Sequence, residues 1–352
     1  STNTAVGYAS LMSITTGTLN VAIGANALDA VTTTTRNVAV GSGAGGGTTS
    51  SGGVFIGNYA GSAANVDNVI IIGRDAGVSV TGTGNIAIGY TALGVHTTGA
   101  RNIAIGEGAM DDTDAGSTSL GSVDNTFIGH NAGGGTWTNA ASNYNVGIGN
   151  YVMDGALAGV QYTTAVGMNA LSAVTSGQNN SVFGTQAGTA ITTGGYNIAI
   201  GAQAMLTHTT GTRNIAIGSN AMDDTNAGSN SLGSVDNIFI GHNAGGGTWT
   251  DVDSNRNVTL GNYTMDAATA GALDNVAVGH YALSSITSGD FNTALGSNAG
   301  LALTTGADNV VIGYLAGDTM TATGNTVLVG KSAGQAINST DANYTIAVGF
   351  KA

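Results

Sequence analysis

A short motif recurs along the whole chain and constrains its fold more than any other feature. The motif reads Asn, a β-former, a small residue, an aliphatic residue and Gly, for example NVAIG ending at Gly24 and NIAIG ending at Gly89. It occurs 20 times, at spacings of 16 to 23 residues and most often 17. One repeat of this length cannot bury a core, whereas stacked repeats share hydrogen bonds and apolar faces. The sequence therefore predicts an all-β fold, a parallel β-solenoid (β-roll) of about 20 stacked coils.

The columns of the motif indicate how each coil is built. The residue before the final Gly is apolar in all 20 copies, and the residue two positions earlier is Val, Ile, Thr or Ser. These two columns lie on one side of a strand, because side chains alternate along it. We expect each coil to contain this strand, a sharp bend at Gly, a second short strand or extended segment, and a turn.

The residue between those two columns is most often alanine, which bears on assembly. Small side chains on that strand face would let chains approach closely, and the column includes Ala22, Ala39, Ala87, Ala104, Ala199 and Ala216. This favours a rod of three parallel identical chains. Uncapped strand edges at the ends of a solenoid would also invite head-to-tail stacking.

The asparagine that opens the motif occupies its column in 15 of 20 copies. Asparagine tolerates left-handed turns, and its amide can both donate and accept hydrogen bonds. We expect an asparagine ladder between equivalent turns of adjacent coils, exemplified by Asn85, Asn102, Asn197 and Asn214. The alternative is a set of unrelated turn asparagines, which the strict phase of the column disfavours.

A longer duplication is superimposed on the short repeat. We interpret residues 1–352 as one continuous repeat domain in which a six-coil block, about 106–217, recurs at about 218–329. The long insertions fall at equivalent places, 111–124 and 130–144 in one copy and 223–236 and 242–256 in the other. Insertions in a solenoid form surface loops.

The two tryptophans of the chain, Trp137 and Trp249, both lie in these insertions, within the sequence GGGTWT. On a loop they could stack on a sugar or a partner surface, with Asn131 and Tyr144 as companions. Alternatively each indole folds back to cover the coil, which we weigh as the better interpretation. Ligand contact is expected to centre on the inserted loops.

Composition and charge exclude several classes of protein. The chain has 59 Gly but no Pro and no Gly-X-Y period, so it is not collagen. A net charge of −13 disfavours nucleic acid as a partner. No apolar run approaches the ~20 residues of a membrane-spanning helix, so we expect no membrane insertion.

Catalytic and metal motifs are not apparent. The sequence has no HExxH, no nucleotide-binding GxxxxGK[ST] and no Ser/His/Asp set organised by the repeat, so we expect neither an enzyme nor a cofactor. An acidic cluster offers weak candidates for calcium, namely Asp111, Asp112, Asp114, Asp223 and Asp224. Solvated turn carboxylates are the favoured interpretation, and no metal site is predicted.

The NxAIGxxA pattern resembles the head repeats of trimeric autotransporter adhesins of the YadA type, and related β-roll repeats of phage tail fibres and other surface fibres. The resemblance extends from Asn3 to Gly349. It implies coils stacked into a rod of three chains with an adhesive surface. The expected function is a structural or adhesive segment of an extracellular, cell-surface or virion tail fibre. Its partners would be copies of itself, and a host-surface glycan or protein receptor.

Three alternatives remain at this stage. One is a monomeric ice-binding solenoid with Thr-rich faces, although threonines cluster as TTG at turns, at Thr97, Thr98, Thr209, Thr210, Thr304 and Thr305. The second is a purely structural filament stacked head to tail. The third, a carbohydrate-active enzyme on a β-helix, lacks paired carboxylates on a strand face.

Overall fold

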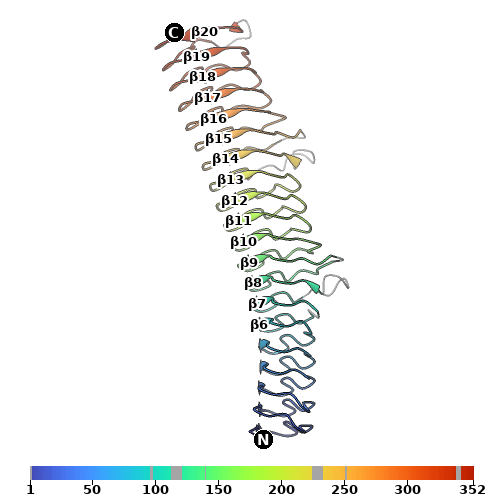
Figure 1. Ribbon diagram of the computed structural model, residues 1–352. Coiled ribbons are helices and arrows are strands. Elements are labelled where there is room, and N and C mark those ends of the chain that lie inside the picture. Colours follow the sequence, from blue (N-terminus) through green and yellow to red (C-terminus); the bar gives the residue numbers. More distant parts are fainter. Residues whose placement is uncertain are drawn as a thin grey trace. The chain divides into compact units, whose positions relative to one another are not determined.

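The computed structural model describes residues 2–95, 98–111, 121–138, 140–223, 233–249, 252–337 and 342–352. The chain divides into two compact units, Ser1–Gln178 and Asn179–Ala352, each of which is described by itself. In both, every coil contributes one strand of three residues, and the strands of a unit follow one another along a stack (Figure 1). The predicted parallel β-solenoid is confirmed.

The first unit contains β1 (Thr4–Val6), β2 (Val21–Ile23), β3 (Val38–Val40), β4 (Val54–Ile56), β5 (Ile70–Ile72), β6 (Ile86–Ile88), β7 (Ile103–Ile105), β8 (Thr126–Ile128), β9 (Val146–Ile148) and β10 (Thr164–Val166). The second contains β11 (Ser181–Phe183), β12 (Ile198–Ile200), β13 (Ile215–Ile217), β14 (Ile238–Ile240), β15 (Val258–Leu260), β16 (Val276–Val278), β17 (Thr293–Leu295), β18 (Val310–Ile312), β19 (Val327–Val329) and β20 (Ile346–Val348).

Pairing within each unit is parallel and in register. Ile86 of β6 faces Ile103 of β7, and Ala87 faces Ala104. The same column-on-column match persists across the long insertion that separates β7 from β8. Residues of one column therefore stack on one another, which is why the short repeat keeps its phase while the coil length varies.

Burial along the strands corrects the expected role of the alanine column. The middle residue of each strand from β2 to β19 is buried, and the six alanines named above are completely inaccessible. They point into the interior of their own coils, so they cannot mediate close approach of a second chain. The outward-facing residues are instead the first and third of each strand.

The segment that follows the bend also differs from expectation. Apart from an isolated bridge between Asn143 and Gln161, the described residues outside β1–β20 form no second strand, and turns occupy this part of each coil. The cause is local: Thr91 and Leu93, after the bend at Gly89, have φ of 54° and 52°, which an extended chain cannot accommodate. Within the described part of the chain no helix has the length and apolar character that a membrane crossing requires.

Candidate functional site

The asparagine column forms a buried ladder in each unit. In the first, the Asn102 backbone N–H donates to Oδ1 of Asn85 (2.8 Å), and Nδ2 of Asn85 donates to the carbonyl of Gly99 (2.8 Å). In the second, the Asn214 N–H donates to Oδ1 of Asn197 (3.0 Å), whose Nδ2 donates to the carbonyl of Gly211 (2.9 Å). Each side-chain amide thus binds two backbone groups of the turn in the next coil.

The ladder has a structural role rather than a ligand-binding one. All four asparagines are at most 1% exposed, so their amides are not available to solvent or to a partner. The turn they clamp contains a residue with positive φ immediately before the asparagine, such as Arg101 (57°) and Arg213 (59°). A turn of that shape cannot continue the strand pairing, and the asparagine supplies the hydrogen bonds that the strand would otherwise have made.

The structure places Trp137 and Trp249 in the core. Both are completely buried, and their Nε1 atoms donate to the carbonyls of Gly133 (3.0 Å) and Gly245 (3.1 Å). Trp137 packs against Phe127 with ring centroids 5.9 Å apart, and Trp249 against Phe239 at 5.6 Å. This is the covering arrangement. The buried indoles do not present their rings to solvent, as the alternative of ligand contact would require.

The two companions of the tryptophans lie elsewhere. Tyr144 is exposed and stacks on Tyr162, with centroids 5.2 Å apart and planes inclined by 4°. Asn131 is partly buried in the turn after β8, with φ of 49°. The duplicated block does not preserve the tyrosine pair, because Arg256 and Asp274 stand at the equivalent positions and form an ion pair of 2.8 Å.

The acidic cluster lies largely outside the described residues. Asp112, Asp114 and Asp224 are not among them, nor are most of the inserted loops 111–124 and 223–236. Asp111 and Asp223 are described and lie in equivalent positions after β7 and β13. Among the residues that the structure describes, no three His, Asp or Glu side chains come together as a candidate metal site.

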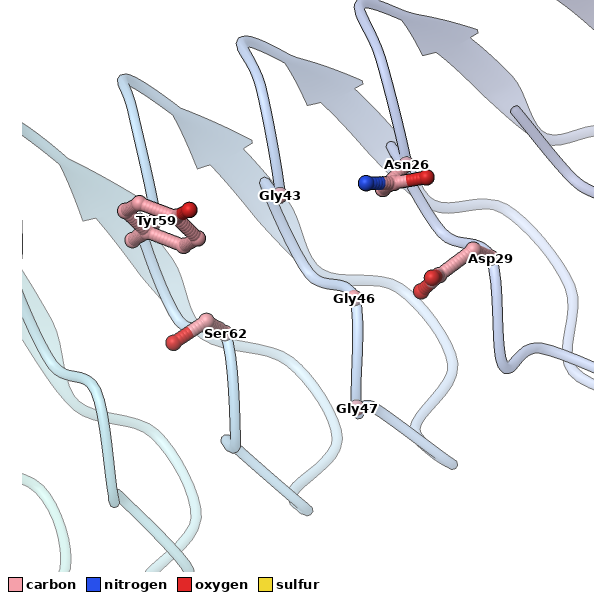
Figure 2. Close-up of a pocket in the computed structure, with 7 residues that line it drawn as sticks. All are labelled: Asn26, Asp29, Gly43, Gly46, Gly47, Tyr59 and Ser62. Carbon is pink, nitrogen blue, oxygen red and sulfur yellow. The ribbon is translucent and has the colours of Figure 1, made fainter. Parts of the chain in front are cut away.

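A surface notch in the first unit brings polar side chains together. Its cavity measures about 360 Å³ and spans three successive coils. Figure 2 shows Asn26 and Asp29 on one coil and Tyr59 and Ser62 two coils further on. The coil between them presents only glycine to the cavity, at Gly43, Gly46 and Gly47.

The glycines are what open this notch. A Cβ on Gly43 would lie 2.6 Å from Cδ1 of Tyr59, and one on Gly46 would lie 3.1 Å from Oδ1 of Asp29. The tyrosine ring and the carboxylate thus lean over the middle coil from opposite sides. Tyr59 is 51% exposed, so one part of its ring packs on the backbone of Gly43 and the rest faces solvent.

The repeated motif alone does not identify this site, which lies in the glycine-rich run GSGAGGG (41–47). The signal lies in the alignment of the coils. This coil carries glycine at all three of the positions that lie two, five and six residues after the final glycine of the motif. At the same positions the preceding coil carries Asn26, Asp29 and Ala30, and the following coil carries Tyr59, Ser62 and Ala63. Because equivalent residues of successive coils stack, a glycine in one coil leaves a hollow when both neighbouring coils carry larger side chains at that position.

The most perturbed histidine of the described chain lies in the second unit. His208 is completely buried, its Nε2 is 3.1 Å from Nδ2 of Asn214, and its Nδ1 has no hydrogen-bond partner. Desolvation lowers the pKa of His208 from 6.5 to about 4. Burial raises the pKa of the Asp266 carboxyl to about 6, and the nearby charge of His242 opposes part of this increase.

These shifts predict how the stability of the second unit depends on pH. Below pH 6.5 the unfolded chain protonates at His208 while the folded chain does not, so stability is lost as pH falls toward 4. Asp266 acts oppositely, because folding favours its protonated form below pH 6. Relative to His208→Gln, the wild-type protein should lose about 2 kcal/mol between pH 7 and pH 5, measured by urea unfolding. Parallel pH profiles for the two proteins would contradict the assignment.

Comparison with known proteins finds no family model and no curated protein sequence that matches the chain.

Proposed function

We propose that this chain is a segment of an extracellular adhesive fibre, on a cell surface or a virion tail, in which parallel copies of the chain pack along their strands. The observation that carries the proposal is the outer strip, defined as the first and third residues of each strand. These residues are aliphatic in most coils and remain partly or largely exposed in a single chain, for example Ile200 at 39% and Leu260 at 51%. Contiguous apolar surface of this extent marks interfaces.

A second copy of the chain is the occupant that fits the strip best. The strip repeats with every coil, so an identical chain in parallel orientation presents the same side chains at the same spacing. A strip of β-branched side chains is also poor in hydrogen-bonding groups, which disfavours a polar ligand. The number of three chains rests on the resemblance to the YadA-type head repeats.

The repetition of the coils supports an attachment role. In an oligomer of chains with nearly identical coils, the same weak surface contact occurs several times. Linked weak contacts together bind with high avidity. The ice-binding alternative is less favoured, because threonine hydroxyls of TTG turns donate to the next coil. Thr15 Oγ1 donates to the Thr32 carbonyl (2.9 Å), and Thr304 Oγ1 donates to the Thr321 carbonyl (2.9 Å).

Sedimentation equilibrium of the full chain tests the assembly. We expect a particle of three times the chain mass of 34.3 kDa. Ile200→Lys and Leu260→Lys together place two charges in the strip and should shift the protein to single chains. Val252→Lys is the matched control, because Val252 is an aliphatic residue 55% exposed outside the strands, and it should leave the mass unchanged. A wild-type protein that sediments as one chain would refute the assembly.

A further inference from the structure

The notch between the coils of Asn26 and Tyr59 has the composition of a binding site. We propose that it binds an uncharged saccharide unit, whose apolar ring face packs on Tyr59 and whose hydroxyls bond Asp29, Asn26 and Ser62. The inference rests on the proposed attachment function and names a ligand for it. It places that ligand away from the inserted loops.

The polar side chains of the notch are not engaged in hydrogen bonds of the folded chain. Within the part of the chain that the structure describes, the side chains of Asn26, Asp29, Tyr59 and Ser62 form no hydrogen bond with one another or with other residues. Elsewhere on the same face such groups do find partners, as when Nδ2 of Asn58 donates to the carbonyl of Ser42. The notch therefore offers an amide, a carboxylate and two hydroxyls that a ligand can pair with.

The size and shape of the notch suit a small ligand. A cavity of about 360 Å³ is at the small end of the range for ligand sites, large enough for one or two sugar rings. The middle coil contributes only the glycines Gly43, Gly46 and Gly47 to the lining, so none of its side chains enters the cavity between the Tyr59 ring and the Asp29 carboxylate. Figure 2 shows the Asp29 carboxylate and the Ser62 hydroxyl on either side of this middle coil.

The charge of the notch favours a neutral ligand over an anionic one. Asp29 is the single ionisable side chain among the residues that line the cavity apart from the phenol of Tyr59, and the lining contains no cation. A carboxylate in a chain of net charge −13 repels anionic sugars and phosphates, but it accepts hydrogen bonds from neutral hydroxyl groups. The exposed tyrosine ring supplies an apolar face with a polar end, which suits the amphipathic surface of a sugar.

Saccharide binding to the full chain is the test, measured by saturation-transfer NMR and titration calorimetry. The probes are the methyl glycosides of glucose, galactose and N-acetylglucosamine, with N-acetylneuraminic acid as the anionic comparison. We expect at least one neutral glycoside to bind and the anionic sugar to bind at least tenfold more weakly. Absence of binding by all three neutral probes, or a preference for the anionic one, would overturn the proposal.

Two variants locate the site. Tyr59→Ala should weaken binding at least tenfold, and Gly46→Met should abolish it by filling the notch, since Met12 occupies the same column in another coil. The matched control is Tyr151→Ala, which removes a tyrosine from the same column, with φ of 56° against 54° for Tyr59; the coil before it carries Asn131 at the column where the coil before Tyr59 carries Gly43. It should bind as the wild type does. Equal loss in all three variants would contradict the assignment to the notch.

The outcome is separable from that of the proposed function. Sedimentation of the same samples reports assembly independently of sugar binding. A trimer that binds no saccharide refutes the notch alone, and a single chain that binds saccharide through Tyr59 refutes the assembly alone.

Discussion

Replacing Gly89 with alanine is expected to lower the free energy of unfolding of the first unit by about 5 kcal/mol. Gly89 ends the repeated motif and has φ of +138°, a conformation that L-residues rarely adopt. A Cβ at this position would also overlap the carbonyl oxygen of Gly106, the equivalent glycine of the next coil, and lie 3.0 Å from the backbone nitrogen of Glu107. The free-energy cost of backbone strain and that of steric overlap therefore add together.

The overlap cannot be relieved locally. The clashing atoms belong to the backbone, and Gly89 and Gly106 are held in place by hydrogen bonds from their own N–H groups to Ile72 and Ile88 (both 2.8 Å). Relief would require the two coils to move apart, which would break the pairing of β6 with β7. We therefore expect the defect to expose the strand edges on either side of it.

Urea unfolding and limited proteolysis of the full chain would measure this effect. Gly121→Ala is the matched control, because Gly121 has no positive φ and the nearest atom to its added Cβ is Oγ1 of Thr98 at 3.7 Å. That variant should be neutral or slightly stabilising, since alanine restricts the unfolded chain. Similar unfolding midpoints for the two variants would show that the anchor glycine is dispensable.

The anchor glycine also shows why so much of the fold could be predicted from sequence. In a stack, one residue meets its own column again in the next coil, so a physical requirement at one position is repeated in the sequence. Gly89 and Asn102 were identified through such columns. The direction in which the strand alanines point was not, because the sequence shows alternation but does not say which of two apolar faces is inside.

The candidate sites were less accessible to this reasoning, for two different reasons. Trp137 lies in an inserted segment that occurs in only two copies, so the repeat gave no indication of which way the indole points. The notch at Gly43 is a departure from the repeat, and it becomes visible only when neighbouring coils are compared column by column. Function in a repeat protein can reside in the coil that differs, and a consensus conceals that coil.

Replacing Asn102 with alanine is expected to destabilise the first unit by about 4 kcal/mol. Oδ1 of Asn102 accepts hydrogen bonds from the backbone N–H (3.0 Å) and Nδ2 (3.1 Å) of Asn125, and its Nδ2 donates to the carbonyl of Ser122 (2.9 Å). Asn125 and Ser122 are completely buried. Alanine would remove these three hydrogen bonds from groups that water cannot reach, and each buried group left unsatisfied costs about 1–3 kcal/mol.

Two further substitutions separate hydrogen bonding from packing. Asn150→Ala is the matched control, because the exposed Asn150 accepts a single backbone bond, from the N–H of His130 (3.1 Å), which water can replace. It should cost less than about 1 kcal/mol. Asn102→Asp keeps the shape but sets a carboxylate against the Ser122 carbonyl in place of a donor. Burial and this repulsion raise the pKa of the introduced carboxyl in the folded state, so the variant should regain stability as pH falls and the acid protonates.

The measurement is the urea midpoint of the three variants at pH 7 and pH 4.5. Recovery of Asn102→Asp at low pH, with no comparable recovery of Asn102→Ala, would identify the donated bond to Ser122 as the stabilising element. If both variants at position 102 instead lose stability equally at both pH values, packing of the side chain rather than its amide holds adjacent coils together. If neither loses more than Asn150→Ala, the ladder is a consequence of the coil stack and does not stabilise it.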